Sequence, residues 1–213
     1  MAFVDLAGFT ALTDVHGDRA AVDLLDAFVG AARDAVGGDD AELVKSIGDA
    51  VMIAATDPGG GLRTVRRLFE ATRALDGFPE PRAGMHHGSV IERGGDYYGA
   101  TVNLAARVAG RAGSSQAFAT ATMLDAAAEA GIGATSLGVQ VLRNVASSVE
   151  LWSLDLCPGD VDVFVDPVCR MRVATSAAAG RVQHGGVEHR FCSLACVAAF
   201  VAEPDRYARR APS

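Results

Sequence analysis

The chain has 213 residues, of which half are hydrophobic and 21% are charged. This composition excludes intrinsic disorder, because it supplies enough apolar side chain for a packed core. No charge-free stretch reaches the roughly 18 apolar residues of a membrane span, and the first residues lack the basic region of a secretory signal. We therefore expect a cytoplasmic protein with no membrane contact.

Net charge is −7, which argues against a nucleic-acid partner, because phosphate neutralisation needs clustered basic side chains. The charge is uneven: residues 1–165 carry a balance of −10 and residues 166–213 a balance of +3. All four cysteines lie at or beyond position 157. In a cytoplasmic protein this clustering favours a local metal site over a disulfide framework. Two modules are therefore expected.

Hydrophobic periodicity and turn residues predict the elements in chain order. A helix over 18–36 follows from apolar residues at helical spacing and ends at Gly37-Gly38, while Gly48-Asp49 predicts a tight hairpin. The full set is a strand over 2–5, a helix over 18–36, strands over 42–47 and 50–55, a helix over 61–76, a strand over 82–92, a helix over 101–111, and strands over 136–143 and 148–155. This order predicts an α+β fold of the ferredoxin-like, split βαβ type.

Two acidic residues stand at the ends of neighbouring predicted strands. Asp5 ends the first strand and Asp49 lies in the hairpin, so both carboxylates can meet at one edge of the sheet. Neither has an obvious basic partner in the sequence, and two close carboxylates repel unless divalent cations bridge them. The single lysine, Lys45, precedes the same hairpin. A metal site is therefore predicted there, although a lone turn aspartate is more often a cap.

Four motifs in this order resemble the catalytic domain of class III nucleotidyl cyclases, over about residues 1–156. They are Phe3-Val-Asp-Leu-Ala-Gly-Phe-Thr10, Val44-Lys-Ser-Ile-Gly-Asp49, Ala83-Gly-Met-His-His-Gly88 and Asp96-Tyr-Tyr-Gly-Ala-Thr-Val-Asn-Leu-Ala-Ala-Arg107. Four linked motifs are far more specific than any one of them. The resemblance implies a cyclase that releases pyrophosphate from a nucleoside triphosphate.

The resemblance also implies roles for residues at matching positions. Asp5 and Asp49 would hold two Mg²⁺ or Mn²⁺ ions at each catalytic site, and Asn103 and Arg107 would hold the ribose and the triphosphate in the transition state. Lys45 and Asp96 would read the base. Since adenine offers an amino donor and a ring-nitrogen acceptor, this pair favours ATP over GTP. In that family each site is shared between two chains, so a homodimer with two sites is expected.

Three residues have weaker assignments. Arg143 precedes a late turn and is a candidate triphosphate contact, with a solvated surface residue as the alternative. His86 and His87 lie in the third motif, where a phosphate contact competes with the commoner structural role of a strand histidine. Only four residues precede Asp5, so either the first strand is clipped or the sequence begins late.

The last part of the chain resembles the small YHS or TRASH-type metal-associated domain, over 166–207. Cys169 stands before a Cys-x3-Cys pair, Cys192 and Cys196. Thiolates select soft or borderline ions such as zinc or copper. His189, His184, water or an effector remain open as the fourth ligand, and a metal-free packing role for the cysteines is the alternative. Cys157 is expected to be a bystander.

The sequence thus predicts a cyclase domain over 1–156, a linker over 157–165, a small cysteine-containing domain over 166–207 and a tail over 208–213. The favoured function is an adenylate cyclase, with the C-terminal domain a candidate metal-responsive regulator. The alternative is a catalytically silent cyclase-like scaffold that carries a metal-sensing or interaction module. All six matched site residues are present, which favours the enzyme.

Overall fold

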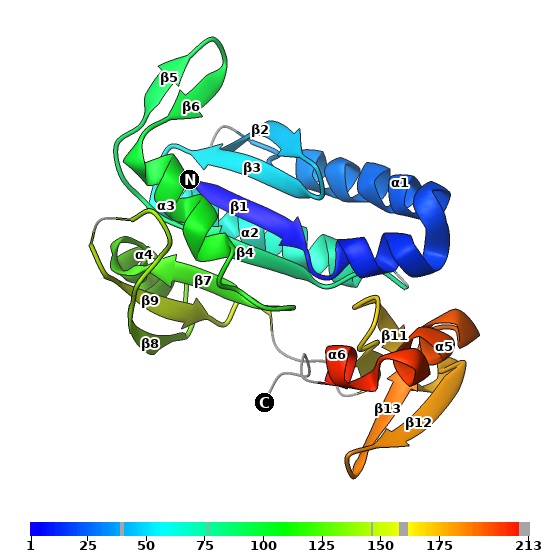
Figure 1. Cartoon of the computed structure of the whole chain (residues 1–213). Coiled ribbons are helices and arrows are strands. Elements are labelled where there is room, and N and C mark those ends of the chain that lie inside the picture. The colour runs from blue at the N-terminus through cyan, green and yellow to red at the C-terminus, as the bar shows by residue number, and fades with distance from the viewer. Residues whose placement is uncertain (39–40, 76, 146, 158–161, 209–213) are drawn as a thin grey trace.

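The computed structural model of the chain describes residues 1–38, 41–75, 77–145, 147–157 and 162–208. Residues 158–161 of the expected linker and residues 209–213 of the expected tail lie outside the described residues. A seven-stranded sheet forms the centre of the larger module, and the smaller module lies below one end of it (Figure 1). Among the described helices, none combines the length and apolar character needed to cross a membrane.

The central sheet has the strand order β2-β3-β1-β4-β7-β9-β8, and only the β4–β7 pair is parallel. Strand β1 is central and pairs with β3 on one side and β4 on the other. The strands are β1 (Ala2–Leu6), β2 (Ala41–Ile47), β3 (Ala50–Ala55), β4 (Pro81–Met85), β7 (Ala117–Thr120), β8 (Ala134–Gln140) and β9 (Val149–Leu154).

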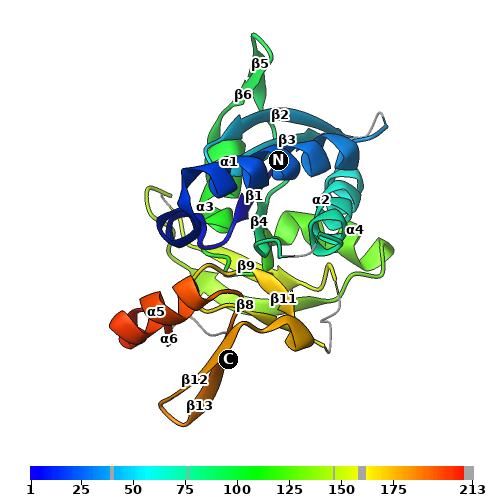
Figure 2. The same cartoon turned by 90° about the vertical axis from the view of Figure 1, so that its right-hand side faces the viewer.

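Helices cover both faces of this sheet. The main core lies between one face and α1 (Phe9–Ala35), α2 (Pro58–Arg73) and α4 (Leu124–Glu129). Helix α3 (Ala100–Ala109) packs on the opposite face, against Phe3 and Met52. Because side chains alternate along a strand, Val4 faces the first layer while Phe3 and Asp5 face the α3 side. The two views show these layers (Figures 1 and 2).

Helix α1 is broken at Gly17, whose φ of 83° and ψ of 164° are not helical. Glycine adopts this left-handed conformation without the steric cost that a Cβ would impose. The break divides α1 into an eight-residue first segment that ends at His16 and a longer second segment over 18–35. Periodicity predicted only the second segment, because the first one buries few residues against the sheet.

The α+β class and the split βαβ order are confirmed, and Gly48-Asp49 does connect a hairpin, with Ile47 opposite Ala50. The predicted strand over 82–92 is wrong in its second half. Strand β4 ends at Met85, and the chain then enters a separate two-stranded ribbon of β5 (Ile91–Arg93) and β6 (Asp96–Tyr98). The ribbon projects from the sheet (Figure 1), so its exposed residues lack the burial that the strand prediction assumed.

The C-terminal module consists of two β-ribbons and two helices. The first ribbon pairs β10 (Val163–Val165) with β11 (Arg172–Ala174), and the second pairs β12 (Gly180–His184) with β13 (Val187–Phe191). Helices α5 (Leu194–Ala202) and α6 (Pro204–Ala208) follow, and two single 3₁₀ turns, Ala121–Met123 and Thr175–Ala177, complete the described elements.

The two modules share a hydrophobic core and backbone hydrogen bonds. Leu12 and Ala21 of α1 pack with Phe191, Phe200 and other buried residues of the C-terminal module. The residues before β4 bond to the start of β11 and to the residues just before it. Glu80 N donates to Arg170 O at 3.3 Å, and Arg172 N donates to Phe78 O at 2.9 Å. The small module is therefore docked on the larger one by main-chain contacts as well as by apolar packing.

Candidate active site and cysteine cluster

Asp5 and Asp49 lie at the same edge of the central sheet. Asp5 pairs in register with Ala50, the residue after Asp49, and Leu6 N donates to Asp49 O at 3.2 Å. Burial raises the pKa of Asp5 to about 6; the guanidinium of Arg82 opposes this shift and the nearby Asp49 carboxylate adds to it. Among the described residues, Asp5 Oδ1 is buried with no hydrogen-bond partner. Asp5 Oδ1 can therefore bind a further ligand without losing a hydrogen bond.

Arg82 is a neighbour of Asp5 that the sequence motifs did not predict. Its Nε donates to Asp5 Oδ2 at 2.8 Å, and its Nη2 contacts the same oxygen. The expectation that Asp5 lacks a basic partner is therefore wrong. The register explains the contact, because Arg82 on β4 lies directly opposite Asp5 on β1. The strand order β1-β4 of a split βαβ sheet was the signal that could have found it.

Lys45 and Asp96 form an ion pair within one chain. Lys45 Nζ lies 2.5 Å from Asp96 Oδ2, and the amide of Tyr97 donates to Asp96 Oδ1 at 2.9 Å. The hydrogen bond from Lys45 and the one from Tyr97 hold the pKa of Asp96 below its usual range. Lys45 lies opposite Met52, which lies opposite Phe3, so the lysine shares the α3 face of the sheet with Asp5.

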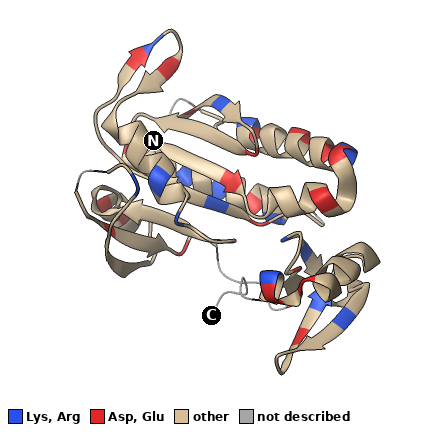
Figure 3. Ribbon diagram, viewed as in Figure 1, with Lys and Arg blue, Asp and Glu red and all other residues tan. Residues whose placement is uncertain are grey.

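Asn103 and Arg107 stand one turn apart on α3, and both are exposed. Arg143 is exposed in the loop between β8 and β9. The ribbon's charged residues and those of α3 can be followed in Figure 3. The structure thus places three predicted pairs of residues on one side of the sheet: Lys45 with Asp96, Asp5 with Asp49, and Asn103 with Arg107.

The two histidines of the third motif differ in environment. His86 is half-buried and shares a hydrogen bond of 2.7 Å between its Nδ1 and Thr120 Oγ1, and burial lowers its pKa. Its carbonyl accepts a bond from the amino group of Met1 at 2.9 Å. His87 is exposed, with its amide bonded to Thr122. His86 therefore has the structural role of a strand histidine.

A groove of about 500 Å³ lies away from the carboxylates. Met1, Ala55 and His87 line it, so it sits at the start of β1 and the end of β3. Asp5 and Asp49 are at the opposite ends of these strands. None of the six residues matched to the cyclase motifs lines this groove.

The three cysteines of the C-terminal module converge. Cys192 Sγ lies 3.5 Å from Cys169 Sγ and 3.6 Å from Cys196 Sγ. Hydrogen bonds from the thiols of Cys169 and Cys192 lower the pKa of Cys196 to about 4. Hydrogen bonds with the thiols of Cys192 and Cys196, together with burial, raise the pKa of Cys169. Cys157 is half-buried away from the cluster, against the main core.

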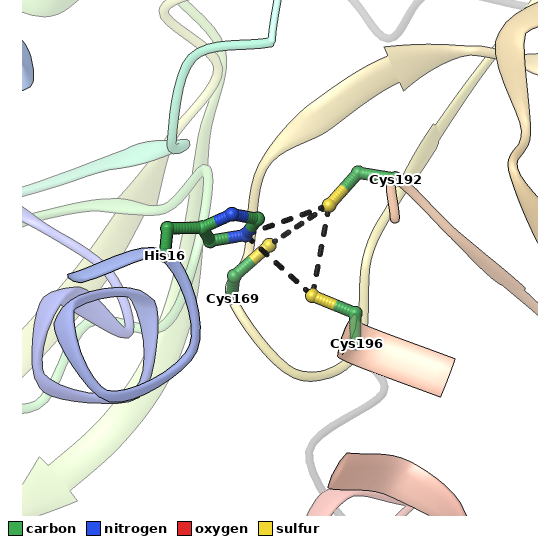
Figure 4. A group of neighbouring side chains, drawn as sticks. All are labelled: His16, Cys169, Cys192 and Cys196. Carbon is green, nitrogen blue, oxygen red and sulfur yellow. Dashed lines mark hydrogen bonds between the residues drawn. The ribbon is translucent and has the colours of Figure 1, made fainter. Parts of the chain in front are cut away.

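The fourth member of the cluster is His16, from the larger module. Its Nε2 lies 3.7 Å from Cys192 Sγ and 3.6 Å from Cys196 Sγ (Figure 4). His189 instead packs its ring against Phe200, 4.8 Å between centroids, and His184 faces Asp205. Neither tail histidine belongs to the cluster, so both were wrong choices for the fourth ligand. Nothing in the local spacing could identify His16, which is more than 150 residues away.

Comparisons with known proteins agree with these features. A family model described as the YHS domain matches residues 164–211. A pH-sensitive adenylate cyclase of Mycobacterium tuberculosis is 40% identical over 110 residues, which cover 52% of this chain and 28% of that protein. The chain spans less than a third of the length of the curated relatives it matches.

Solved structures share the fold of the larger module. An adenylate cyclase from Trypanosoma brucei, described in its monomeric state, has a TM-score of 0.67 and 23% identity, with 74% of this chain and 89% of that chain covered. A guanylyl cyclase has a TM-score of 0.58 and 21% identity, covering 72% and 89%. The resemblance to nucleotidyl cyclase catalytic domains and to the YHS domain, which the motifs carried, is thereby confirmed.

Proposed function

We propose that the protein is an adenylate cyclase, which converts ATP to cyclic AMP and pyrophosphate at sites shared between two copies of the chain. One observation carries the proposal: Asp5 with Asp49, and Lys45 with Asp96, form two pairs on the same side of one sheet. The first pair suits metal-bound phosphates and the second suits an adenine edge. The adenylate cyclase named among the relatives supports the same activity.

The carboxylates fit Mg²⁺ or Mn²⁺, because these ions prefer oxygen ligands and Asp5 Oδ1 is buried without a hydrogen-bond partner among the described residues. Two such ions, held by Asp5 and Asp49, would polarise the phosphate oxygens and favour the ionised 3′ hydroxyl. Arg82 keeps the second oxygen of Asp5 in place. The arginine thus orients the carboxylate rather than replacing the cation.

The remaining residues bind and orient the nucleotide. Lys45 would donate to N1 of adenine, and the ionised Asp96 would accept from its amino group. Guanine presents an acceptor, O6, and a donor, N1–H, where adenine presents a donor and an acceptor. The same pair would therefore be mismatched with GTP and would disfavour it. Asn103 would position the ribose, and Arg107 would neutralise charge that develops on the phosphates as pyrophosphate leaves. Arg143 is a further candidate for the triphosphate.

The exposure of the two α3 residues supports a site shared between chains. Asn103 and Arg107 are exposed on α3, with their side chains open to solvent in the single chain. A second copy, placed head to tail, would bring its Asp5 and Asp49 against Asn103 and Arg107 of the first and so complete the site. Two equivalent sites per homodimer result from this two-fold arrangement.

Incubation of the purified full chain with ATP and Mn²⁺ or Mg²⁺, followed by chromatography of the products, tests the proposal. We expect cyclic AMP and pyrophosphate in equal amounts. Asp49→Asn should reduce the rate by at least about a hundredfold, because it removes a metal ligand. Asp26→Asn, which changes an exposed carboxylate of α1, is the matched control and should retain full activity. A folded wild-type chain that forms no cyclic AMP with either ion would favour the silent scaffold instead.

A further inference from the structure

We infer that His16, Cys169, Cys192 and Cys196 form a four-coordinate site for one zinc-class ion, with ligands from both modules, and that the ion clamps the modules together. Their ligand atoms all lie within 4.8 Å of one another. Figure 4 shows the imidazole and the three sulfurs pointing toward a common centre. The inference stands apart from the proposed cyclase activity, because its consequences can be measured without a nucleotide.

Four of the six separations between ligand atoms match those around a tetrahedral ion. With bonds of about 2.3 Å to sulfur and about 2.0 Å to nitrogen, neighbouring ligand atoms are about 3.5 to 3.8 Å apart. Two of the three sulfur pairs are 3.5 and 3.6 Å apart, and two of the three sulfur–nitrogen distances are 3.6 and 3.7 Å. The remaining two distances, both from Cys169 Sγ, are within 4.8 Å. A disulfide requires about 2.05 Å between sulfurs, so all of these thiols are reduced.

The cluster is held in position by a buried carboxylate. Asp166, which is fully buried, accepts hydrogen bonds from Val168 N at 2.8 Å and Cys169 N at 3.4 Å through Oδ1, and from Cys192 N at 2.8 Å through Oδ2. One side chain therefore fixes both cysteine-bearing loops. Cys196 is set by the first turn of α5, where its amide donates to Ser193 Oγ at 3.2 Å. Such preorganisation is typical of metal ligands.

The donor set selects the class of ion. Three thiolates and one imidazole suit Zn²⁺, and they are poor ligands for the Mg²⁺ that the carboxylate pair prefers. Four protein ligands leave no open position for a substrate, which is the arrangement of structural zinc sites. The ion would also offset the repulsion among three thiolates less than 5 Å apart.

The position of His16 makes the ion a clamp between modules. His16 ends the first segment of α1, directly before the break at Gly17, and that segment follows the strand that carries Asp5. Cys169 is adjacent to Arg170, whose side chain lies against Gly8 in the β1–α1 turn. Metal binding would therefore join the small module to the segment next to the candidate catalytic carboxylates.

The site is tested on the full chain, purified under reducing conditions and measured by elemental analysis. We expect about one zinc per chain. Co²⁺ loaded in its place should give thiolate charge-transfer bands and the intense visible bands of a tetrahedral ion. His16→Ala should weaken zinc binding by at least about tenfold, since it removes a ligand. His184→Ala is the matched histidine control and should bind zinc normally. Cys192→Ser should lower the zinc content, because it removes a thiolate ligand, and its matched control, Cys157→Ser, should bind zinc normally.

His16→Cys provides a variant that keeps a ligand. It should retain Co²⁺ and show the stronger charge transfer of four thiolates. Hydrogen exchange of loaded and chelator-stripped protein then tests the clamp. Removal of zinc should reduce protection in residues 9–16 and 164–172 of the wild type, and His16→Ala should lose this zinc-dependent protection in 9–16.

Two outcomes would overturn the inference. A wild-type chain that takes up no Zn²⁺ or Co²⁺ while its thiols are reduced would leave the cluster as packing alone. His16→Ala with the wild-type zinc affinity and an unchanged Co²⁺ spectrum would confine the ion to the C-terminal module and remove the clamp.

Discussion

Arg170 of the C-terminal module lies directly against Gly8 of the β1–α1 turn: a Cβ built on Gly8 would come within 2.4 Å of Arg170 Cγ. Gly8 also has a φ of 77°, in the left-handed region that favours glycine. The turn that follows Asp5 thus needs glycine both for its own conformation and for the approach of the other module.

Gly8→Ala should destabilise the protein by about 2 to 4 kcal/mol, because it adds left-handed strain and a clash. Gly138→Ala is the matched control: its φ is 72° and a Cβ there meets no atom within 4 Å, so only strain of about 1 kcal/mol should appear. Urea unfolding of both variants measures the difference. Equal losses in the two would mean that Arg170 does not press on Gly8 in solution.

The ion pair of Lys45 and Asp96 predicts a specificity switch that needs two changes together. Lys45→Glu alone places two carboxylates where Lys45 and Asp96 are now 2.5 Å apart. Their repulsion should lower activity with both ATP and GTP. Lys45→Glu with Asp96→Cys should raise the GTP-to-ATP ratio of kcat/KM by roughly tenfold or more. Tyr97→Phe, on the same ribbon, is the control and should keep the wild-type ratio. An unchanged ratio in the double variant would contradict base reading by this pair.

Sharing of the site between chains predicts complementation. Asp49→Asn and Asn103→Ala should each be inactive alone. After subunit exchange in equal amounts, half of the dimers carry one intact site of two, so roughly a quarter of the wild-type rate should return. Mixing two Asp49→Asn preparations is the control. Absence of recovery after mass spectrometry has verified mixed dimers would argue for a site within one chain.

The sequence predicted much of the fold because its signals were local. Glycines mark the hairpin at Gly48, and helical periodicity located the second segment of α1. The strand over 82–92 failed because apolar and β-branched residues there stand in an exposed ribbon, Ile91 included. A run of β-branched and apolar residues indicates a preference for extended backbone, but it does not show whether that strand joins the central sheet and is buried.

The candidate sites divide in the same way. Motif spacing located the three cysteines and the residues of the cyclase motifs. Arg82 was not predicted because sheet register brings it to Asp5, 77 residues away in the chain. His16 was not predicted because module docking brings it to cysteines up to 180 residues away. Their local sequences carry no trace of those contacts. A histidine at the end of an eight-residue helical segment has the same local sequence whether or not cysteines from another module surround it.

The last prediction concerns Arg82, whose guanidinium is the cation beside the partly buried Asp5. Arg82→Gln should lower the free energy of unfolding by about 1 to 3 kcal/mol, since it leaves a carboxylate with little water and no charged partner. Asp5→Asn in the same chain should recover part of that loss, because the amide needs no counter-charge. The two single variants and the double variant, unfolded in urea with a chelator present, give the coupling energy.

Divalent cations give this prediction a second readout. If Asp5 binds Mn²⁺, the ion should stabilise Arg82→Gln more than the wild type, because it would replace a lost cation as well as bind an open oxygen. Thermal unfolding with and without Mn²⁺ measures both effects, and the Arg82→Gln, Asp5→Asn double variant should respond least. A coupling energy near zero would mean that the Arg82–Asp5 pair contributes nothing to stability in solution. An equal Mn²⁺ response in the wild type, Arg82→Gln and the double variant would mean that the ion binds away from Asp5.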